Sequence, residues 1–206
     1  MPTVTGFVER RGRAKVFVDG EFWAEIDAAV AFELGLSEGV ELSAEALSEA
    51  RVAGERPLAM TRALNVLGYR ARAEGELWER LERAGYADGT VEAVVERLRE
   101  LGYLDDEEFA RNAAREKARR YGPRRILIDL KRSGVDEEVA REAVDEEFAG
   151  NDEMEAASAA ARRRYNTGER SDALARRVYG FLARRGYSAG VCAEIAKWYR
   201  EGGSWE

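Results

Sequence analysis

The chain has 206 residues, of which 35% are charged and only three are proline, and its formal net charge is −7. This length suits one large domain or a small domain joined to an elongated array, and the abundance of Ala, Glu, Arg and Leu indicates a mainly helical protein. The net negative charge argues against a protein whose whole surface binds nucleic acid, although it leaves room for a local basic face.

Residues and motifs that the chain lacks disfavour several classes of function. Histidine, the commonest general base and metal ligand, is absent, and so are a P-loop and a nucleophile elbow. We therefore expect no enzyme activity, no cofactor and no metal. Cys192 is the only cysteine, and no stretch approaches the roughly 20 apolar residues that span a bilayer. We expect a buried thiol in a cytoplasmic protein without membrane contact.

The N-terminal part of the chain predicts a three-stranded antiparallel meander. Apolar and polar residues alternate over Thr3–Glu9 and Lys15–Val18, and again over Glu21–Ile26. Asp19-Gly20 predicts a two-residue type I′ turn between the second and third strands, because glycine accepts the positive φ that this turn needs. Arg10–Arg13 predicts a looser first turn.

Two short helices are expected to cover one face of this small sheet, which would be unstable alone. One begins near Asp27 and ends at Gly35, and Ser43 suits the N-cap of the other. Gly54–Pro57 has the composition of a linker. The sequence therefore predicts a β-rich N-terminal extension over residues 1–55.

From Pro57 onward the chain repeats itself. The pattern Leu-x-x-x-Gly-[Tyr/Val] recurs about every 50 residues, which is a spacing typical of stacked helical repeats. It occurs at Leu81–Tyr86, Leu130–Val135 and Leu182–Tyr187. Each glycine lies where a helix ends in a left-handed residue, and the next apolar residue can fold back onto that helix. The pattern therefore predicts a helical corner.

A further helix precedes each corner, so each repeat should contain three helices. The predicted repeats cover residues 57–104, 105–150 and 151–206, the last with a tail. The fold class is thus mainly all-α, with tandem three-helix repeats in an elongated array after a small β meander.

A row of cations lies on one face of the first helix of the second repeat. Arg111, Arg115 and Arg119 are spaced four residues apart, so they align along that helix. Arg124 and Arg125 follow at a predicted helix start, where cations are disfavoured by roughly 0.3–1 kcal/mol and call for a compensating anion. The candidate partner-binding residues are Arg111, Arg115, Arg119, Arg120, Arg124, Arg125, Lys131 and Arg132.

Internal neutralisation is the alternative for these cations. Glu146 and Glu147, or the cluster Asp105–Glu108, could pair with some of them inside the array. The cluster also lies at a predicted helix start, where acids cap free N–H groups. Gly122 is expected to end the first helix of this repeat, and Pro123 suits the first turn of the next.

The second repeat resembles the RecX family of bacterial regulatory proteins. The strings that carry the likeness are Leu101–Arg111, Tyr121–Ile126 and Leu130–Val135. The likeness is densest over residues 98–148 and looser over 58–97 and 152–201, while the β-rich start resembles an extension carried by some members. The third repeat departs most, because Asn166–Asp172 reads as a longer connection.

The resemblance implies a non-catalytic protein of DNA repair and recombination. Its partner would be RecA, bound chiefly as a filament on single-stranded DNA, with docking along the filament groove and reduced filament growth, recombination and ATPase activity. We also expect a monomer, and a weak direct contact to DNA is compatible with this role. The competing hypothesis is a helical DNA-binding regulator, but the helices after each corner glycine are acidic, unlike typical recognition helices.

Overall fold

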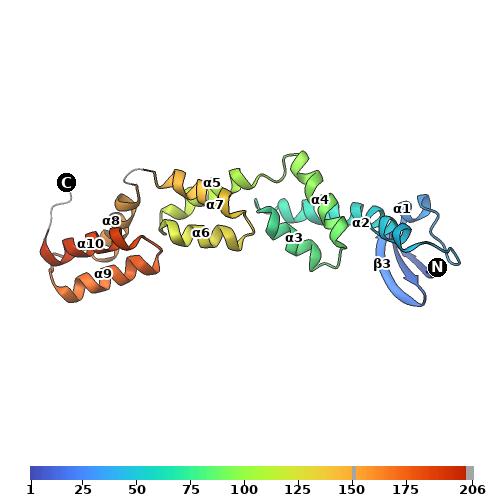
Figure 1. Ribbon diagram of the computed structural model, residues 1–206, viewed down its shortest axis with the longest axis horizontal. Helices are drawn as coiled ribbons and strands as arrows, with labels where there is room; N and C mark the ends of the chain where they lie inside the picture. The colour runs from blue at the N-terminus through green and yellow to red at the C-terminus, as the bar shows by residue number, and fades with distance from the viewer. Residues whose placement is uncertain (150–151, 203–206) are drawn as a thin grey trace. The chain divides into compact units, whose positions relative to one another are not determined.

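A computed structural model describes residues 1–149 and 152–202, without the side chain of Asp152. The chain divides into two compact units, Met1–Leu104 and Asp105–Glu206. The described residues form three strands and ten helices (Figure 1). The predicted fold class, mainly helical with tandem three-helix repeats after a small sheet, is confirmed. Most of the predicted tail, residues 203–206, lies outside the described residues.

The N-terminal sheet is an antiparallel meander in the order β1-β2-β3, as predicted. Its strands are β1 (Val4–Arg10), β2 (Arg13–Val18) and β3 (Glu21–Asp27). Both turns are two residues long with positive φ at each residue, at Arg11 and Gly12 (53° and 75°) and at Asp19 and Gly20 (49° and 85°). The looser turn predicted at Arg10–Arg13 is therefore wrong, because Arg11 adopts the left-handed conformation that sequence preference assigns to Asn, Asp or Gly.

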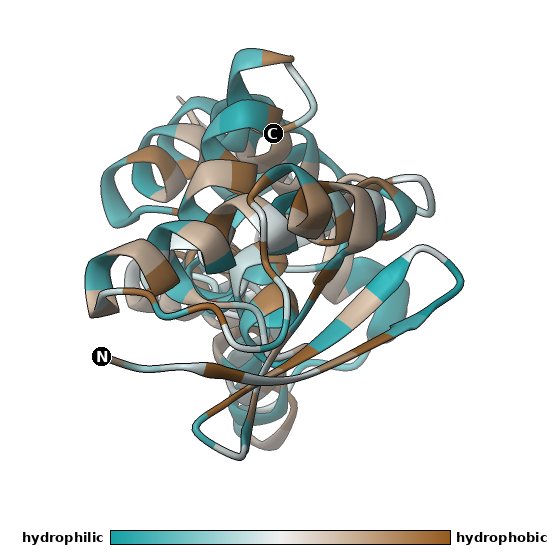
Figure 2. Cartoon of the chain, turned by 90° about the vertical axis from the view of Figure 1, so that its right-hand side faces the viewer, coloured by the Kyte–Doolittle hydropathy of each residue, from teal (hydrophilic) through white to brown (hydrophobic). Residues whose placement is uncertain are grey.

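One face of the sheet packs on helices α1 (Ala28–Glu33) and α2 (Ala44–Leu67). The core between them includes Val16, Ala24 and Ile26. Figure 2 shows the sheet in front of the helices, with hydrophobic and hydrophilic positions alternating along its strands. The alternation that predicted these strands therefore reflects one buried and one exposed face.

Helix α2 runs without interruption through the linker predicted at Gly54–Pro57, so that prediction is wrong. Gly54 packs directly against the sheet, where an added Cβ would lie 2.7 Å from Cβ of Ile26. The predicted boundary between extension and first repeat thus falls inside a helix that belongs to both.

The first repeat combines the C-terminal half of α2 with α3 (Glu74–Glu82) and α4 (Asp88–Glu100). Glu55 of α2 is 2% exposed and accepts hydrogen bonds from the Ala87 backbone N–H, the Thr90 hydroxyl and the Arg51 guanidinium, each at 2.8 Å. This carboxylate therefore satisfies the Ala87 N–H at the start of α4, which the helix itself leaves free.

The second unit contains the other two repeats. Their helices are α5 (Asp106–Ala118), α6 (Pro123–Arg132), α7 (Glu137–Glu147), α8 (Asp152–Arg164), α9 (Asp172–Arg184) and α10 (Ala189–Glu201). The three corner glycines, Gly85, Gly134 and Gly186, have φ of 91°, 84° and 88°, so the predicted left-handed corners are confirmed. The segment 165–171 between α8 and α9 lacks regular structure, which confirms the longer connection.

The carboxylate at the position of Glu55 recurs in the other repeats. Glu153 of α8 lies four residues before the buried Ala157, just as Glu55 lies four residues before the buried Ala59. Its carboxylate accepts a hydrogen bond of 2.6 Å from the Ser188 backbone N–H at the start of α10. Asp106 holds the same position in the second repeat. The sequence analysis did not identify this element of the repeat.

Cys192 is buried, as predicted, and burial raises the pKa of its thiol. Over residues 1–149 and 152–202, no helix is both long and apolar enough to cross a membrane. Within the same ranges, no group of three or more Cys, Asp and Glu side chains is placed to hold a metal ion.

Candidate partner-binding site

Two helical corners of the second unit meet through their backbones. The Gly122 N–H, before α6, donates to the Arg185 carbonyl at 2.9 Å, and the Arg124 N–H donates to the Gly186 carbonyl at 3.1 Å. The Arg185 guanidinium also donates to the Arg120 carbonyl at 2.7 Å. The second and third repeats are thus joined at one point by main-chain contacts.

Glycine is required at this contact for steric reasons. A Cβ on Gly122 would lie 2.5 Å from the Tyr187 backbone nitrogen, and one on Gly186 would lie 2.5 Å from the Arg125 backbone nitrogen. The prediction that Gly122 ends α5 is wrong. That helix ends at Ala118, and Gly122 is the N-cap of α6. Its role is close approach between two backbones.

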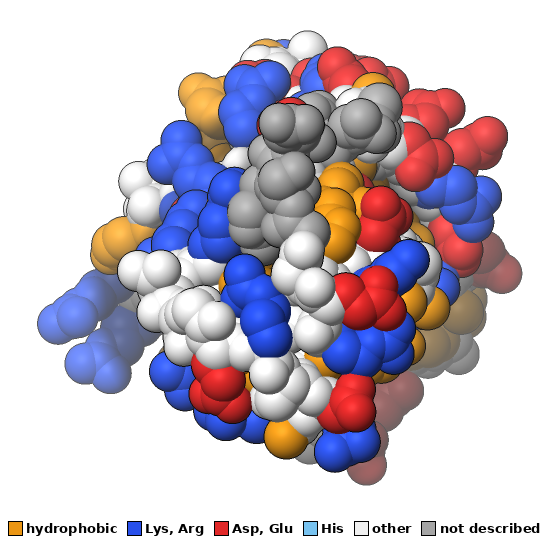
Figure 3. Space-filling view, turned by 90° about the vertical axis from the view of Figure 1, so that its left-hand side faces the viewer, with side chains coloured by type: hydrophobic (Ala, Val, Ile, Leu, Met, Phe, Trp, Pro, Cys, Tyr) orange, Lys and Arg blue, Asp and Glu red, His pale blue; other side chains and the backbone are white. Residues whose placement is uncertain are grey.

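A pocket of about 460 Å³ opens beside this contact. We call it the arginine pocket; its lining residues are Arg119, Arg120, Tyr121, Ala160, Arg163, Arg164, Phe181 and Arg185. Five of these eight residues are arginines and none is acidic. Figure 3 looks onto the end of the chain that carries α9 and α10; Lys and Arg side chains predominate on the left of this view and mix with acidic side chains on the right.

Two arginines of the pocket contact aromatic rings. The Arg185 guanidinium lies 4.6 Å from the centre of the Phe181 ring, and that of Arg164 lies 5.8 Å from the centre of the Tyr165 ring. In the described part of the chain, none of the five forms a salt bridge. The pocket therefore presents concentrated positive charge without a counter-charge, which suits an anionic group of a partner.

The structure separates the eight predicted binding residues into two groups. Three of them have acidic partners: Arg111 pairs with Glu107 at 3.4 Å, Arg125 with Asp129 at 3.2 Å and Lys131 with Glu137 at 2.6 Å. These three cations are therefore paired within the protein, which was the alternative hypothesis. Of their partners, Glu107 was among the acids named in the sequence analysis, and Asp129 and Glu137 were not.

The other five predicted residues form no ion pair with any described residue. They are Arg115, Arg119, Arg120, Arg124 and Arg132. Two of them, Arg119 and Arg120, enter the arginine pocket, where they meet three arginines of the third repeat. The sequence analysis missed Arg163, Arg164 and Arg185 as site residues, although runs of arginine at these positions gave a signal.

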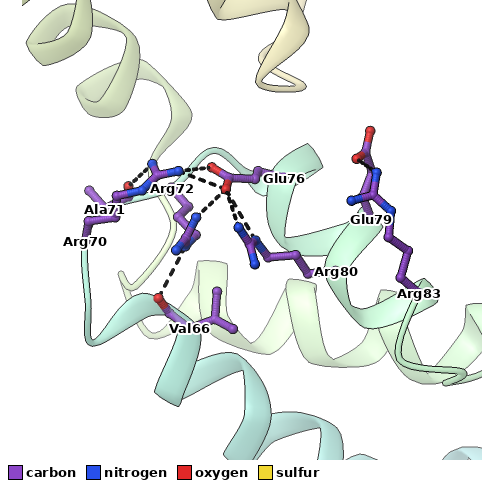
Figure 4. Close-up of polar contacts among 8 residues, drawn as sticks. All are labelled: Val66, Arg70, Ala71, Arg72, Glu76, Glu79, Arg80 and Arg83. Carbon is purple, nitrogen blue, oxygen red and sulfur yellow. Dashed lines mark hydrogen bonds and ion pairs between the residues drawn. The ribbon is translucent and has the colours of Figure 1, made fainter.

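The first repeat contains an arginine cluster of the opposite kind. Glu76 lies among three arginines: Arg70 at 2.9 Å, Arg80 at 3.2 Å, and Arg72, which also donates to the Val66 carbonyl (Figure 4). Burial opposes the charged form of Glu76, but the arginines outweigh it and hold the pKa of the carboxyl below its ordinary value. Each of the three arginines in this cluster therefore contacts a carboxylate of the protein itself, although the cations outnumber that carboxylate.

Comparison with known proteins identifies the three repeats. Models of the first, second and third three-helix domains of RecX match residues 59–98, 105–144 and 151–195. The regulatory protein RecX of Thermobifida fusca is 36% identical over 141 residues, which cover 65% of this chain and 74% of that protein.

Other relatives agree with this match. The regulatory protein RecX of Bacillus licheniformis is 29% identical over 162 residues, which cover 76% of this chain but only 61% of the relative. A crystal structure of regulatory protein RecX, 23% identical, superposes with a TM-score of 0.62 over 96% of this chain and 100% of its own, which shows a shared fold.

Proposed function

The chain belongs to the RecX family, and from that membership we propose that it binds the RecA nucleoprotein filament and inhibits or modulates its assembly, strand exchange and ATPase activity. It acts without catalysis or cofactor, as a monomer in the cytoplasm. The observation that supports a binding role best is the arginine pocket, where five arginines from two successive repeats converge without an acidic residue in the lining.

A repeating partner suits a site built in this way. The pocket exists only where the second and third repeats meet, so a ligand that occupies it contacts both repeats at once. A tandem array gains avidity when its partner presents equivalent groups at regular intervals, as a filament does. Guanidinium groups bind carboxylates and phosphates through paired hydrogen bonds, so either component of a nucleoprotein filament offers suitable anions.

A regulator that reads duplex DNA through a helix in the major groove is a weaker proposal. The helix after the corner glycine of the second repeat, α7, begins with Glu137 and Glu138 and also carries Glu142. Recognition helices place polar and basic side chains against base edges and phosphates, and acids repel phosphates. The arginines of the pocket lie instead between α5 and α6 and at the C-terminal ends of α8 and α9.

The test is a titration of the full chain against three ligands at one salt concentration: assembled RecA filaments on single-stranded DNA, free RecA and the bare DNA. We expect tighter binding to the filament than to either component. The variant Arg119→Gln/Arg163→Gln, which removes one pocket arginine from each repeat, should weaken filament binding about tenfold to a hundredfold while its melting temperature stays unchanged.

A matched control removes the same charge from the same unit. Arg141 and Lys197 are exposed cations outside the pocket, paired with Glu137 and Glu201. Arg141→Gln/Lys197→Gln should bind the filament like the wild type. Equal affinity of the wild type for filament and bare DNA would contradict the proposal in favour of direct DNA binding, and equal losses in both variants would remove the pocket from the site.

A further inference from the structure

The two turns of the N-terminal sheet have the same backbone geometry but different residues. At the second turn, Asp19 adopts positive φ, as aspartate readily does, and its side chain accepts a hydrogen bond of 2.9 Å from the Thr3 backbone N–H. At the first turn the same conformation is imposed on Arg11, with φ of 53°. The left-handed conformation is unfavourable for arginine, because its Cβ approaches the following carbonyl.

The side chain of Arg11 makes no contact that compensates for this conformation within the described part of the chain. Among the described residues, the Arg11 side chain forms no hydrogen bond and no ion pair. A strained residue without an internal contact indicates a role toward something outside the chain. Asp19, at the equivalent position of the neighbouring turn, is of a residue type that adopts positive φ readily, so the turn itself gives no reason for an arginine at position 11.

The cations around Arg11 share one open face of the sheet. Val8 faces Lys15, and Arg10 faces Arg13, as cross-strand partners. Cross-strand partners lie on the same face, and like charges directly opposite each other destabilise a sheet. With Arg11 and Glu25 these residues line a groove of about 710 Å³, which we call the hairpin groove.

The charge of the hairpin groove is strongly one-sided. It contains four cations and a single acid, Glu25, which pairs loosely with Arg13 at 3.8 Å. The core residues Val16, Ala24 and Ile26 occupy the opposite face. The hairpin therefore turns its basic face outward while its apolar face fixes it to α1 and α2.

We propose that the hairpin groove binds the phosphate backbone of a nucleic-acid duplex. A duplex carries about one negative charge per 1.7 Å of its axis, twice the density of a single strand, so it suits four cations gathered at one hairpin tip. A single strand is the weaker fit, because its binding sites rely on aromatic side chains that stack on bases, and no aromatic residue lines the groove.

This inference goes beyond the proposed function and does not rest on RecA. The groove lies in the first unit, within residues 8–25, whereas the family models begin at residue 59. The proposal gives a function to the N-terminal sheet, which lies outside the three RecX repeats.

The experiment measures binding of the full chain to a labelled DNA duplex of about 20 base pairs, and to one of its strands, between about 50 and 200 mM salt. The decisive variant is Arg11→Asn, which removes the charge and installs a residue that favours positive φ. Its melting temperature should stay equal or rise. Its affinity for the duplex should fall about threefold to tenfold, and the salt dependence should flatten by about one released counterion.

Two further variants complete the design. Arg10→Gln/Arg11→Asn/Arg13→Gln should weaken duplex binding at least about tenfold. Arg97→Gln, on α4 of the same unit and outside the groove lining, removes one exposed charge and should leave binding unchanged. The Arg11→Asn effect should persist in the Arg119→Gln/Arg163→Gln background, which separates the hairpin groove from the arginine pocket.

Each alternative outcome overturns the proposal. Duplex affinity like that of the wild type in the triple variant shows that the groove does not bind the duplex. A larger loss for the single strand than for the duplex assigns the groove to single-stranded DNA. Unchanged duplex binding with weakened binding to free RecA assigns it to an acidic protein surface.

Discussion

The arginine cluster of the first repeat and the arginine pocket of the second unit differ in their counter-charge. Around Glu76, Arg70, Arg72 and Arg80 share one carboxylate that is 20% exposed, whereas no acid lines the pocket where five arginines meet. The arginines around Glu76 each contact an acid of the protein, whereas the arginines of the pocket have no acid in their lining and can contact an anion of a partner. A count of arginines along the sequence therefore does not locate a binding surface; the placement of the acids does.

The two clusters also differ in what assembles them. Side chains hold the first together, since Arg72 is largely buried and bridges Glu76 and the Val66 carbonyl. Backbone contacts assemble the second, since Gly122 and Gly186 allow two corners to touch before any arginine is placed. Substitutions at a glycine and at a carboxylate should separate these two mechanisms.

The largest effect is expected for Gly122→Ala. The new Cβ would meet backbone atoms of Gly186 and Tyr187 at 2.5–2.7 Å, and backbone cannot rotate away as a side chain can. We expect a loss of about 2–3 kcal/mol in the free energy of unfolding of the second unit, measured by chemical denaturation. Filament binding should fall as well, although every arginine is retained, because the two halves of the pocket move apart.

The matched control is Gly168→Ala, in the connection between α8 and α9. An added Cβ there meets nothing within 4 Å, and the backbone does not have positive φ. Its stability should stay within about 0.5 kcal/mol of the wild type. If Gly122→Ala unfolds at the same denaturant concentration as this control, the corner contact does not assemble the pocket.

Glu76→Gln should have a smaller effect, on stability alone. It keeps the shape of the side chain but leaves three arginines without their shared anion, which should cost about 1–2 kcal/mol. Because the pKa of Glu76 is lowered in the folded state, its contribution is present above the ordinary value of 4.5 and is lost as pH falls through the lower folded pKa. Denaturation curves of wild type and variant should therefore converge in acid.

Glu79→Gln provides the comparison for this variant. Glu79 is 59% exposed and pairs with Arg83 as its one ionic partner among the described residues, so its replacement should cost less than about 0.5 kcal/mol. A loss as large as that of Glu76→Gln, or a difference between Glu76→Gln and wild type that does not shrink as the pH is lowered, would show that the charge of the shared carboxylate does not stabilise the first repeat.

Periodicity and glycine positions predicted most of the fold, since local chemistry determines those features. The meander followed from alternation, and the three corners followed from glycines whose left-handed conformation ends a helix. The prediction of a linker at Gly54–Pro57 was wrong because it relied on the residue composition and could not include the packing of this segment. Gly54 is small so that α2 can lie against Ile26, and Glu55 is buried as a cap for α4.

The sequence predicted only part of the candidate site. The row Arg111, Arg115 and Arg119 follows from helical spacing, but helical spacing does not reveal the acidic partners that come from other helices, such as Asp129 of α6, which pairs with Lys117 of α5 across 12 residues. The pocket itself joins Arg120 to Arg185, 65 residues away. Runs of arginine signalled both halves, and only the docking of the two corners shows that they form one surface.

The smallest effect is a rise in melting temperature when a small polyanion occupies the arginine pocket. An anion that binds the folded protein stabilises it by mass action, and tripolyphosphate at several times its dissociation constant should add on the order of 1 kcal/mol, or a few degrees. The Glu76 cluster should contribute less to this shift, because its three arginines already contact a carboxylate of the protein. The measurement is a thermal melt at increasing tripolyphosphate, with sodium chloride at matched ionic strength to account for screening.

The variants described above assign the shift to a place in the molecule. Arg119→Gln/Arg163→Gln should lose most of it, whereas Arg141→Gln/Lys197→Gln, with the same net charge, should keep it. The hairpin groove is a second basic surface, so any shift that remains in the pocket variant should disappear when Arg11→Asn is added. A shift that survives both substitutions, or one that sodium chloride reproduces, would mean that the absence of acids around these arginines does not create an anion site.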